Sequence, residues 1–166
     1  QRFLLTTAAA VALISGPALA AQDAIRLGMV LEPPGLDPTA NAAAAIDEIT
    51  YANLFEGLTR FAPDGSIAPA LAESWEAKDG GKVYEFRLRK GVKFHSGATL
   101  TCRDAEYTFE RNLVTNSAES GNWFIAEPLL GTQNNANDDK SVTWDKIDKA
   151  VECNSKGQLV FTLPKV

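Results

Sequence analysis

The chain has 166 residues and a formal net charge of −5, and 45% of its residues are hydrophobic. This composition is typical of one globular domain plus a tail and argues against a disordered, collagen-like or coiled-coil protein. Net acidity without a Lys/Arg cluster disfavours binding to nucleic acid or to an anionic membrane. With one His and two Cys, a His/Cys zinc site is disfavoured and no cofactor is expected.

The N-terminus has the order of features found in a secretory signal peptide. Arg2 precedes an apolar run at 3–14, and Ala18-Leu19-Ala20 is a small-x-small pattern that signal peptidase cuts after. Residues 1–20 are therefore predicted to be removed, so that the mature chain starts at Ala21. The apolar run is short for a bilayer span, and the alternatives are a buried helix or a membrane anchor.

Export changes what the two cysteines indicate. Cys102 and Cys153 form an even pair in an oxidising compartment, which favours an internal disulfide. Two buried free thiols or an intermolecular bridge are the alternatives. A catalytic cysteine is disfavoured because His95 is its one possible imidazole partner, and nothing in the sequence places them together.

The pattern after the leader predicts a strand, a rigid loop and a helix. Residues 24–31 alternate between apolar and polar and then run apolar, which indicates a strand that becomes buried. Three prolines and a glycine at 32–38 predict a loop with few accessible conformations. Apolar residues at helical spacing predict a helix over 41–56, with Gly57 just past its end.

The middle of the chain is predicted to form short antiparallel strands. A strand at 58–61 leads into a Pro-Asp-Gly turn at 63–65. A hairpin follows, and its arms at 75–78 and 84–89 carry apolar side chains at every second position, which places them on one face. Residues 92–95 predict a third short strand.

The last part of the chain is predicted to contain two helices and a strand. Thr101-x-x-Asp104 resembles a capping box and predicts the start of a helix there. Residues 123–125 form an apolar insert in a polar loop, 144–150 a short helix and 158–163 a final strand. The order of elements predicts a mixed α/β fold with an antiparallel component. Because the opening strand lacks neighbours, we expect an N-terminal piece of a longer protein.

Enzyme motifs are not found in the sequence. It contains no G-x-S-x-G, P-loop, H-E-x-x-H or C-x-x-C pattern. The acidic pairs Asp47-Glu48 and Asp138-Asp139 are interpreted as solvated surface rather than catalytic pairs. His95 alone would be a weak metal ligand, so no metal site is predicted. We expect a protein that is not an enzyme.

Several segments together closely resemble the signature of the family 5 extracellular solute-binding proteins. The matching segments are 70–76, Asp79-Gly80, 84–97 and 100–111, with Pro34-Gly35-Leu36-Asp37-Pro38 and Leu54-Phe55-Glu56-Gly57-Leu58 in the expected order before them. Members of this family are periplasmic receptors of ABC importers for peptides or nickel. The resemblance implies a two-lobed fold, much longer than this chain, with the ligand enclosed between the lobes.

The resemblance also implies a domain organisation. Residues 1–20 would be the signal peptide, and residues 21–40 the start of lobe one of a type II periplasmic binding protein. Residues 41–166 would be an incomplete α/β subdomain inserted into that lobe. The second lobe would lie outside this chain.

Candidate ligand contacts follow from the same resemblance. In doubly wound lobes the cleft lies at the C-terminal ends of the strands, which points to the loop after the first strand. Glu32 is the candidate partner for a ligand ammonium group, and an aromatic pair is a candidate for lining a pocket or packing in the core. The full set of candidates is Leu31, Glu32, Pro33, Pro34, Trp123 and Phe124.

The function implied by the resemblance is capture of di- or oligopeptides by hinge closure, followed by delivery to ABC permease subunits in the inner membrane. The protein would act as a monomer in the periplasm, without nucleic-acid partners. Two alternatives stay open. One is a receptor of the same family for nickel or another small solute, and the other is a stand-alone secreted module without catalytic activity.

Overall fold

A computed structural model describes residues 24, 26–39, 42–115, 123–134 and 139–165, with the side chains of Thr115 and Trp123 left out. The predicted signal peptide lies outside the described residues. The chain divides into two compact units, Gln1–Val30 and Leu31–Val166. The second unit contains α1 (Ala44–Thr50), β1 (Thr59–Phe61), β2 (Ile67–Pro69), β3 (Ala72–Lys78), the short 3-10 helix η1 (Asp79–Gly81), β4 (Val83–Leu88), α2 (Cys102–Thr115), α3 (Trp123–Leu130), α4 (Trp144–Ala150), β5 (Val151–Cys153) and β6 (Leu159–Thr162).

The described residues of the first unit form no strand, so the strand expected over 24–31 is wrong there. Leu27 is 85% exposed and Val30 is 98% exposed. A strand that is apolar on both faces needs a neighbour on each side. None of the strands in the described ranges pairs with this segment.

The second unit is built on a four-stranded antiparallel sheet with the order β3-β4-β6-β5. β3 and β4 form the hairpin that the period-two pattern predicts, with Trp75 opposite Phe86. Their connection passes through η1, where Gly80 and Gly81 have φ values of 66° and 96° that glycine adopts without steric cost. The mixed α/β fold with an antiparallel component is therefore confirmed.

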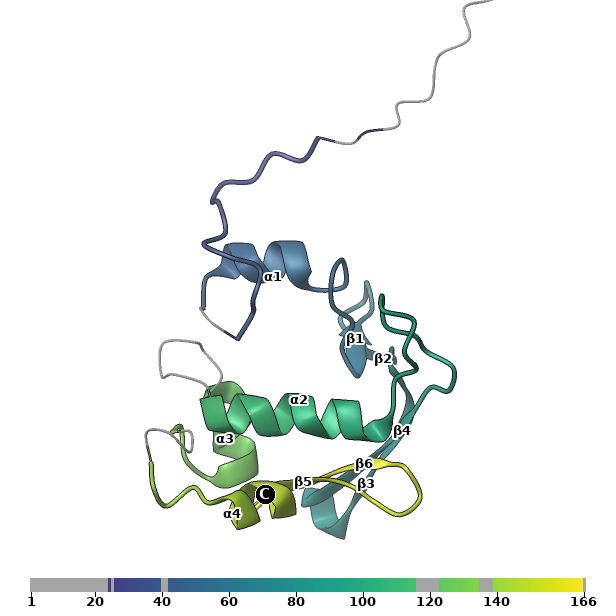
Figure 1. Cartoon of the computed structure of the whole chain (residues 1–166), viewed down its shortest axis with the longest axis vertical. Coiled ribbons are helices and arrows are strands. Elements are labelled where there is room, and N and C mark those ends of the chain that lie inside the picture. Colours follow the sequence, from purple (N-terminus) through teal and green to yellow (C-terminus); the bar gives the residue numbers. More distant parts are fainter. Residues whose placement is uncertain (1–23, 25, 40–41, 116–122, 135–138, 166) are drawn as a thin grey trace, which may run out of the picture. The chain divides into compact units, whose positions relative to one another are not determined.

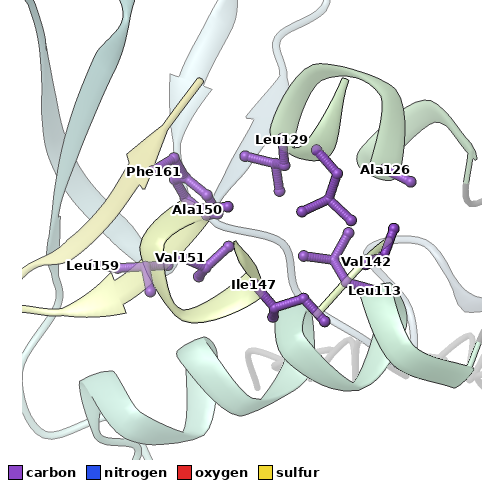
Figure 2. Packing of buried hydrophobic residues seen from close by; sticks show 10 residues of the cluster. Leu113, Ala126, Leu129, Val142, Ile147, Ala150, Val151, Leu159 and Phe161 are labelled. Atoms are coloured by element: carbon purple, nitrogen blue, oxygen red, sulfur yellow. The ribbon is translucent and has the colours of Figure 1, made fainter. Parts of the chain in front are cut away.

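The hydrophobic core lies where helices α2, α3 and α4 meet strands β5 and β6 (Figure 1). Figure 2 shows buried side chains from these elements pointing toward one another. Ile147 and Leu159 are fully buried at its centre. The cluster comprises Leu113, Ala126, Leu129, Leu130, Val142, Ile147, Ala150, Val151, Leu159 and Phe161.

A row of aromatic rings crosses the sheet and reaches α2. Trp75 on β3 stacks on Phe86 of β4, with ring centroids 6.1 Å apart. Phe161 of β6 then contacts Phe86 and Phe109 edge to face, at 5.5 Å and 4.7 Å. Such aromatic pairs add stability beyond the area that they bury. They couple the hairpin to the helix that follows it in the sequence.

Helix α2 begins as the sequence predicts. The Asp104 carboxylate accepts hydrogen bonds from the backbone N–H of Thr101 at 2.7 Å and from its hydroxyl at 2.6 Å. These bonds hold the pKa of Asp104 below its usual range. Cys102, the first residue of α2, is joined to Cys153, the last residue of β5, by a disulfide with a Cα–Cα distance of 5.7 Å.

The helix predicted over 41–56 is much shorter in the structure, where α1 spans Ala44–Thr50. The carbonyl of Thr50 accepts from the backbone N–H groups of Leu54 and Phe55 at 3.1 and 3.0 Å. Ala52, which lies between Thr50 and Leu54, has a φ of 57°, in the left-handed region. The helix therefore ends at Thr50, six residues before the predicted end at residue 56, and the chain turns at Ala52 rather than at Gly57.

Other predicted elements differ in detail. Residues 92–95 form no strand; a single bridge joins Lys93 to Thr99. The apolar insert at 123–125 is the start of α3 rather than part of a loop. The short helix at 144–150 and the last strand are confirmed. No helix in the described ranges has the length and apolarity needed to cross a membrane.

The predicted turn at 63–65 joins β1 and β2, which form a two-stranded antiparallel sheet. Asp64 accepts from the backbone N–H of Ser66 at 3.0 Å and from its hydroxyl at 2.7 Å. This local bonding fixes the turn, as is usual for Asp before Gly. Strand β2 itself was not expected from the sequence.

Candidate ligand-binding loop

The loop Leu31–Pro34 belongs to the second unit and is open to solvent. Leu31 is 65% exposed, Glu32 and Pro34 are also exposed, and Pro33 is half-buried. Two consecutive prolines fix φ at their own positions and keep the residue before each of them extended. The carboxylate of Glu32 is therefore presented to solvent from a stiff stretch of backbone.

A polar network lies just after this loop. The Asp37 carboxylate accepts from the backbone N–H of Thr39 at 2.8 Å and from its hydroxyl at 2.6 Å. Arg111 of α2 donates from Nη1 to the Thr39 hydroxyl at 3.0 Å, and its Nη2 lies 3.7 Å from Asp37 Oδ2. The network joins the loop to the helix that carries the end of the resemblance segment 100–111.

The charge state of this network is fixed by its hydrogen bonds. The two bonds from Thr39 hold the pKa of Asp37 below its usual range, and the Arg111 guanidinium acts in the same direction. Partial burial raises the pKa of Asp37, but by less than these contacts lower it. Asp37 is therefore ionised at neutral pH, which keeps the contact with Arg111 charged on both sides.

The two aromatic candidates come from the start of α3. Phe124 is 67% exposed on that helix, so it is not a core residue in the described structure. Trp123 is the first residue of α3, and its side chain lies outside the described residues. Helix α3 was not predicted because the sequence around it is polar and because it contains Pro128, a residue that usually interrupts a helix.

A first hollow, missed from the sequence, has a volume of about 540 Å³ and is lined by residues 51–57 together with two arginines. Arg89 donates from Nε and Nη2 to the carbonyl of Ala70, both at 3.2 Å. Arg60 donates from Nε to the carbonyl of Pro69 at 3.3 Å. Both guanidinium groups therefore hold backbone in place. In the sequence, part of this lining lies in the segment Leu54–Leu58, which also contributes to the family resemblance.

A second hollow of about 550 Å³ is open and apolar. Tyr84, Phe86, Phe109 and Phe161 contribute to its wall, next to the aromatic row. None of the five candidate residues whose side chains the structure describes lines either of the two hollows; these five are Leu31, Glu32, Pro33, Pro34 and Phe124. In the described structure the candidate loop is thus an exposed surface outside both hollows.

Metal binding has no support in the part of the chain that the structure describes. No three His, Cys, Asp or Glu side chains are placed there to hold an ion. His95 is exposed in a turn. What the loop offers chemically is a solvated carboxylate that accepts hydrogen bonds, which suits a cationic group on a ligand.

Comparison with known proteins identifies the family. Residues 66–166 match the profile of the bacterial extracellular solute-binding proteins, family 5 (its middle part). The chain belongs to this family, and the resemblance noted on segments 70–111 is confirmed. Its architecture is that of a fragment of a two-lobed periplasmic binding protein.

Individual relatives are peptide-binding proteins by name. The chain is 43% identical over 91 residues to Di/tripeptide-binding protein 3 of Pseudomonas aeruginosa, which covers 51% of this chain and 17% of that protein. It is 31% identical over 121 residues to the periplasmic murein peptide-binding protein MppA of Escherichia coli, covering 72% and 22%. The substrate-binding domain of an oligopeptide ABC transporter from Bacillus anthracis matches with a TM-score of 0.64 and 26% identity, covering 79% and 24%. The chain thus spans about a fifth of the length of these relatives.

Proposed function

We propose that this chain is part of a periplasmic receptor that captures di- or oligopeptides and delivers them to an ABC importer. The observation that carries the proposal is the 43% identity to a di/tripeptide-binding protein within a family match over residues 66–166. The receptor binds its solute without catalysing a reaction and works as a monomer with permease subunits in the inner membrane.

In this proposal the mature receptor starts at Ala21, after export and removal of residues 1–20. Residues 21–40 begin lobe one, and residues 41–166 belong to a subdomain inserted into it. The second lobe, encoded outside this chain, closes over the ligand about a hinge. Ligand stabilises the closed form because it contacts both lobes there and one lobe in the open form.

The ligand contacts on this side of the cleft come from the loop Leu31–Pro34. Glu32 accepts hydrogen bonds from the free ammonium group at the N-terminus of the peptide, and the exposure of its side chain supports this role. Phe124, exposed on α3, and its neighbour Trp123 supply apolar wall to the pocket.

The test is isothermal titration calorimetry on the complete mature receptor, purified from the periplasm and checked by intact mass for a start at Ala21. Alanyl-alanine and trialanine should bind, whereas N-acetyl-alanyl-alanine should bind about tenfold more weakly because its ammonium group is missing. Binding of Ni(II)–histidine with no binding of either peptide would overturn the peptide proposal in favour of a metal-complex receptor.

A pair of variants tests the role of Glu32. Glu32→Gln should weaken alanyl-alanine binding about tenfold and should leave binding of the acetylated peptide unchanged. Glu48→Gln, an exposed acid on α1, is the matched control and should bind both peptides like the wild type. If Glu32→Gln lost affinity equally for both peptides, the carboxylate would not be recognising the ammonium group.

A further inference from the structure

We propose that Arg111 is a positioning residue for ligand binding. It holds the segment Asp37–Thr39 against α2 and thereby orders the loop Leu31–Pro34 before the ligand arrives. This inference rests on the proposed function, because it assumes that this loop faces the ligand. Arg111 itself touches no ligand in this scheme.

The first step of the argument is the geometry of the network. Arg111 reaches the Thr39 hydroxyl at 3.0 Å with one N–H group and lies 3.7 Å from the Asp37 carboxylate with another nitrogen. The Thr39 hydroxyl in turn donates to Asp37 at 2.6 Å. A side chain on a helix thus donates a hydrogen bond to Thr39, 72 positions earlier in the chain, and forms an ion pair with Asp37.

The second step is that the chain between this network and the candidate loop is short and stiff. Asp37 lies three positions after Pro34, with two residues between them, which limits the distance between their Cα atoms to about 11 Å even when the chain is extended. Pro33, Pro34 and Pro38 each have a fixed φ, and the residue before each proline is kept extended. Gly35 is the one position with wide backbone freedom. Fixing Asp37 therefore restricts where Glu32 is placed.

The third step concerns magnitude. The side chains of Arg111 and Asp37 are 41% and 54% exposed, and an ion pair this open contributes little to the stability of the folded state. The same contact has a larger effect on a loop that has few other contacts, because it removes disorder that ligand binding would otherwise have to remove. Affinity should respond to its loss more than stability does.

The experiment compares variants of the complete mature receptor by titration with alanyl-alanine and by thermal unfolding. Arg111→Ala should bind roughly two- to tenfold more weakly, the cost of ordering one or two side chains on binding, with little change in Tm. Arg111→Lys keeps the charge but loses the paired N–H groups of the guanidinium. Its affinity for alanyl-alanine should therefore lie between those of the wild type and Arg111→Ala. Arg87→Ala removes another surface arginine, 66% exposed against 41% for Arg111, that pairs with Glu73 on the hairpin, and it should bind like the wild type.

A rescue variant separates positioning from a structural role. A Cβ at Gly35 would meet no atom within 4 Å, so Gly35→Ala fits and stiffens the loop. Adding Gly35→Ala to Arg111→Ala should restore part of the lost affinity, which would not happen if Arg111 merely stabilised α2. Hydrogen exchange of the ligand-free receptor should be faster at residues 31–39 in Arg111→Ala and unchanged in α2.

The outcomes distinguish this inference from the proposed function. Failure of the wild type to bind any peptide overturns the proposed function, and this inference with it. Peptide binding by the wild type together with equal binding by Arg111→Ala overturns the inference alone. A loss of affinity that comes with a similar loss of Tm, faster exchange in α2 and no rescue by Gly35→Ala also overturns it.

Discussion

The carboxylate of Glu106 in α2 accepts a hydrogen bond of 2.7 Å from the backbone N–H of Cys153 in β5, 47 residues away. Glu106 is 6% exposed, and its other oxygen pairs with Arg103 one helical turn earlier. Among the described strands, β5 lies at the edge of the sheet, so none of them bonds to its outward N–H groups. Glu106 satisfies one of these groups beside the disulfide that joins the same two elements.

This contact gives Glu106 a role in the stability of the fold. Glu106→Ala leaves the Cys153 N–H without its acceptor and should lower the free energy of unfolding by about 1–3 kcal/mol. Glu106→Gln keeps an oxygen acceptor and should cost clearly less. Urea unfolding followed by tryptophan fluorescence measures both. Glu76→Ala, whose side chain is 71% exposed beside Lys78, is the control and should change little. Equal losses for Ala and Gln at Glu106 would contradict the role of its oxygen.

The disulfide between Cys102 and Cys153 closes a loop with a sequence separation of 51 residues. Replacing both cysteines with alanine should destabilise the protein by about 2–4 kcal/mol, since the unfolded chain is no longer constrained. Urea unfolding with and without dithiothreitol measures the effect. The reductant should destabilise the wild type by a similar amount and leave the double variant unaffected. If alkylation labels both cysteines of the unreduced, unfolded protein, the bond is absent.

Glu110 makes the stability of the folded protein depend on pH, and the direction of this dependence follows from its pKa. Burial, and then the neighbouring carboxylates of Glu106 and Asp148, raise the pKa of Glu110 above its usual range, with Arg103 opposing them. An acid whose pKa is raised by folding favours the native state most at low pH. That contribution is lost as pH rises from the unfolded pKa, about 4.3, through the folded pKa.

Glu110→Gln removes this titration. The variant should gain stability relative to the wild type as pH rises from about 4 to 7, with no gain at the acidic end. Urea unfolding at a series of pH values measures the difference, and Glu48→Gln, exposed on α1, is the control. A difference between Glu110→Gln and the wild type that stays constant across this range would mean that Glu110 titrates alike in the folded and unfolded states.

The elements that the sequence predicts well are those with local causes. The hairpin through Trp75 and Phe86 follows from alternation within each arm, and α2 from the bonding of Thr101 to Asp104 three residues on. The strand at 24–31 fails because its pattern requires partners that are not among the described strands. A strong local pattern was thus enough for these two elements, whereas a strand whose pattern requires partners on both sides could not be judged from its own residues.

The candidate loop was also predictable only in part. Its position and stiffness follow from the prolines at 33, 34 and 38, which any observer of the sequence can find. Its attachment to Arg111 could not be predicted, because no local pattern connects residues 72 positions apart. Sequence inspection therefore found the loop that is proposed to face the ligand but missed the residue proposed to hold it.

Ala52 offers a test of where α1 ends. Its φ of 57° is strained for any residue with a Cβ, and its N–H bonds to the carbonyl of Phe55 at 3.0 Å within the turn that follows Thr50. Ala52→Gly relieves that strain but makes the unfolded chain more flexible, so the net gain in the free energy of unfolding should be about 0.5–1 kcal/mol.

The matched control is Ala45→Gly, at a buried position inside α1, which should lose about 1 kcal/mol because glycine is a poor helix former. Urea unfolding of both variants measures whether each substitution raises or lowers the free energy of unfolding. If Ala52→Gly destabilised the protein as Ala45→Gly does, residue 52 would be helical, and the longer helix predicted over 41–56 would be the correct description. A gain at Ala52 with a loss at Ala45 places the end of the helix between them, because a left-handed residue cannot continue an α-helix.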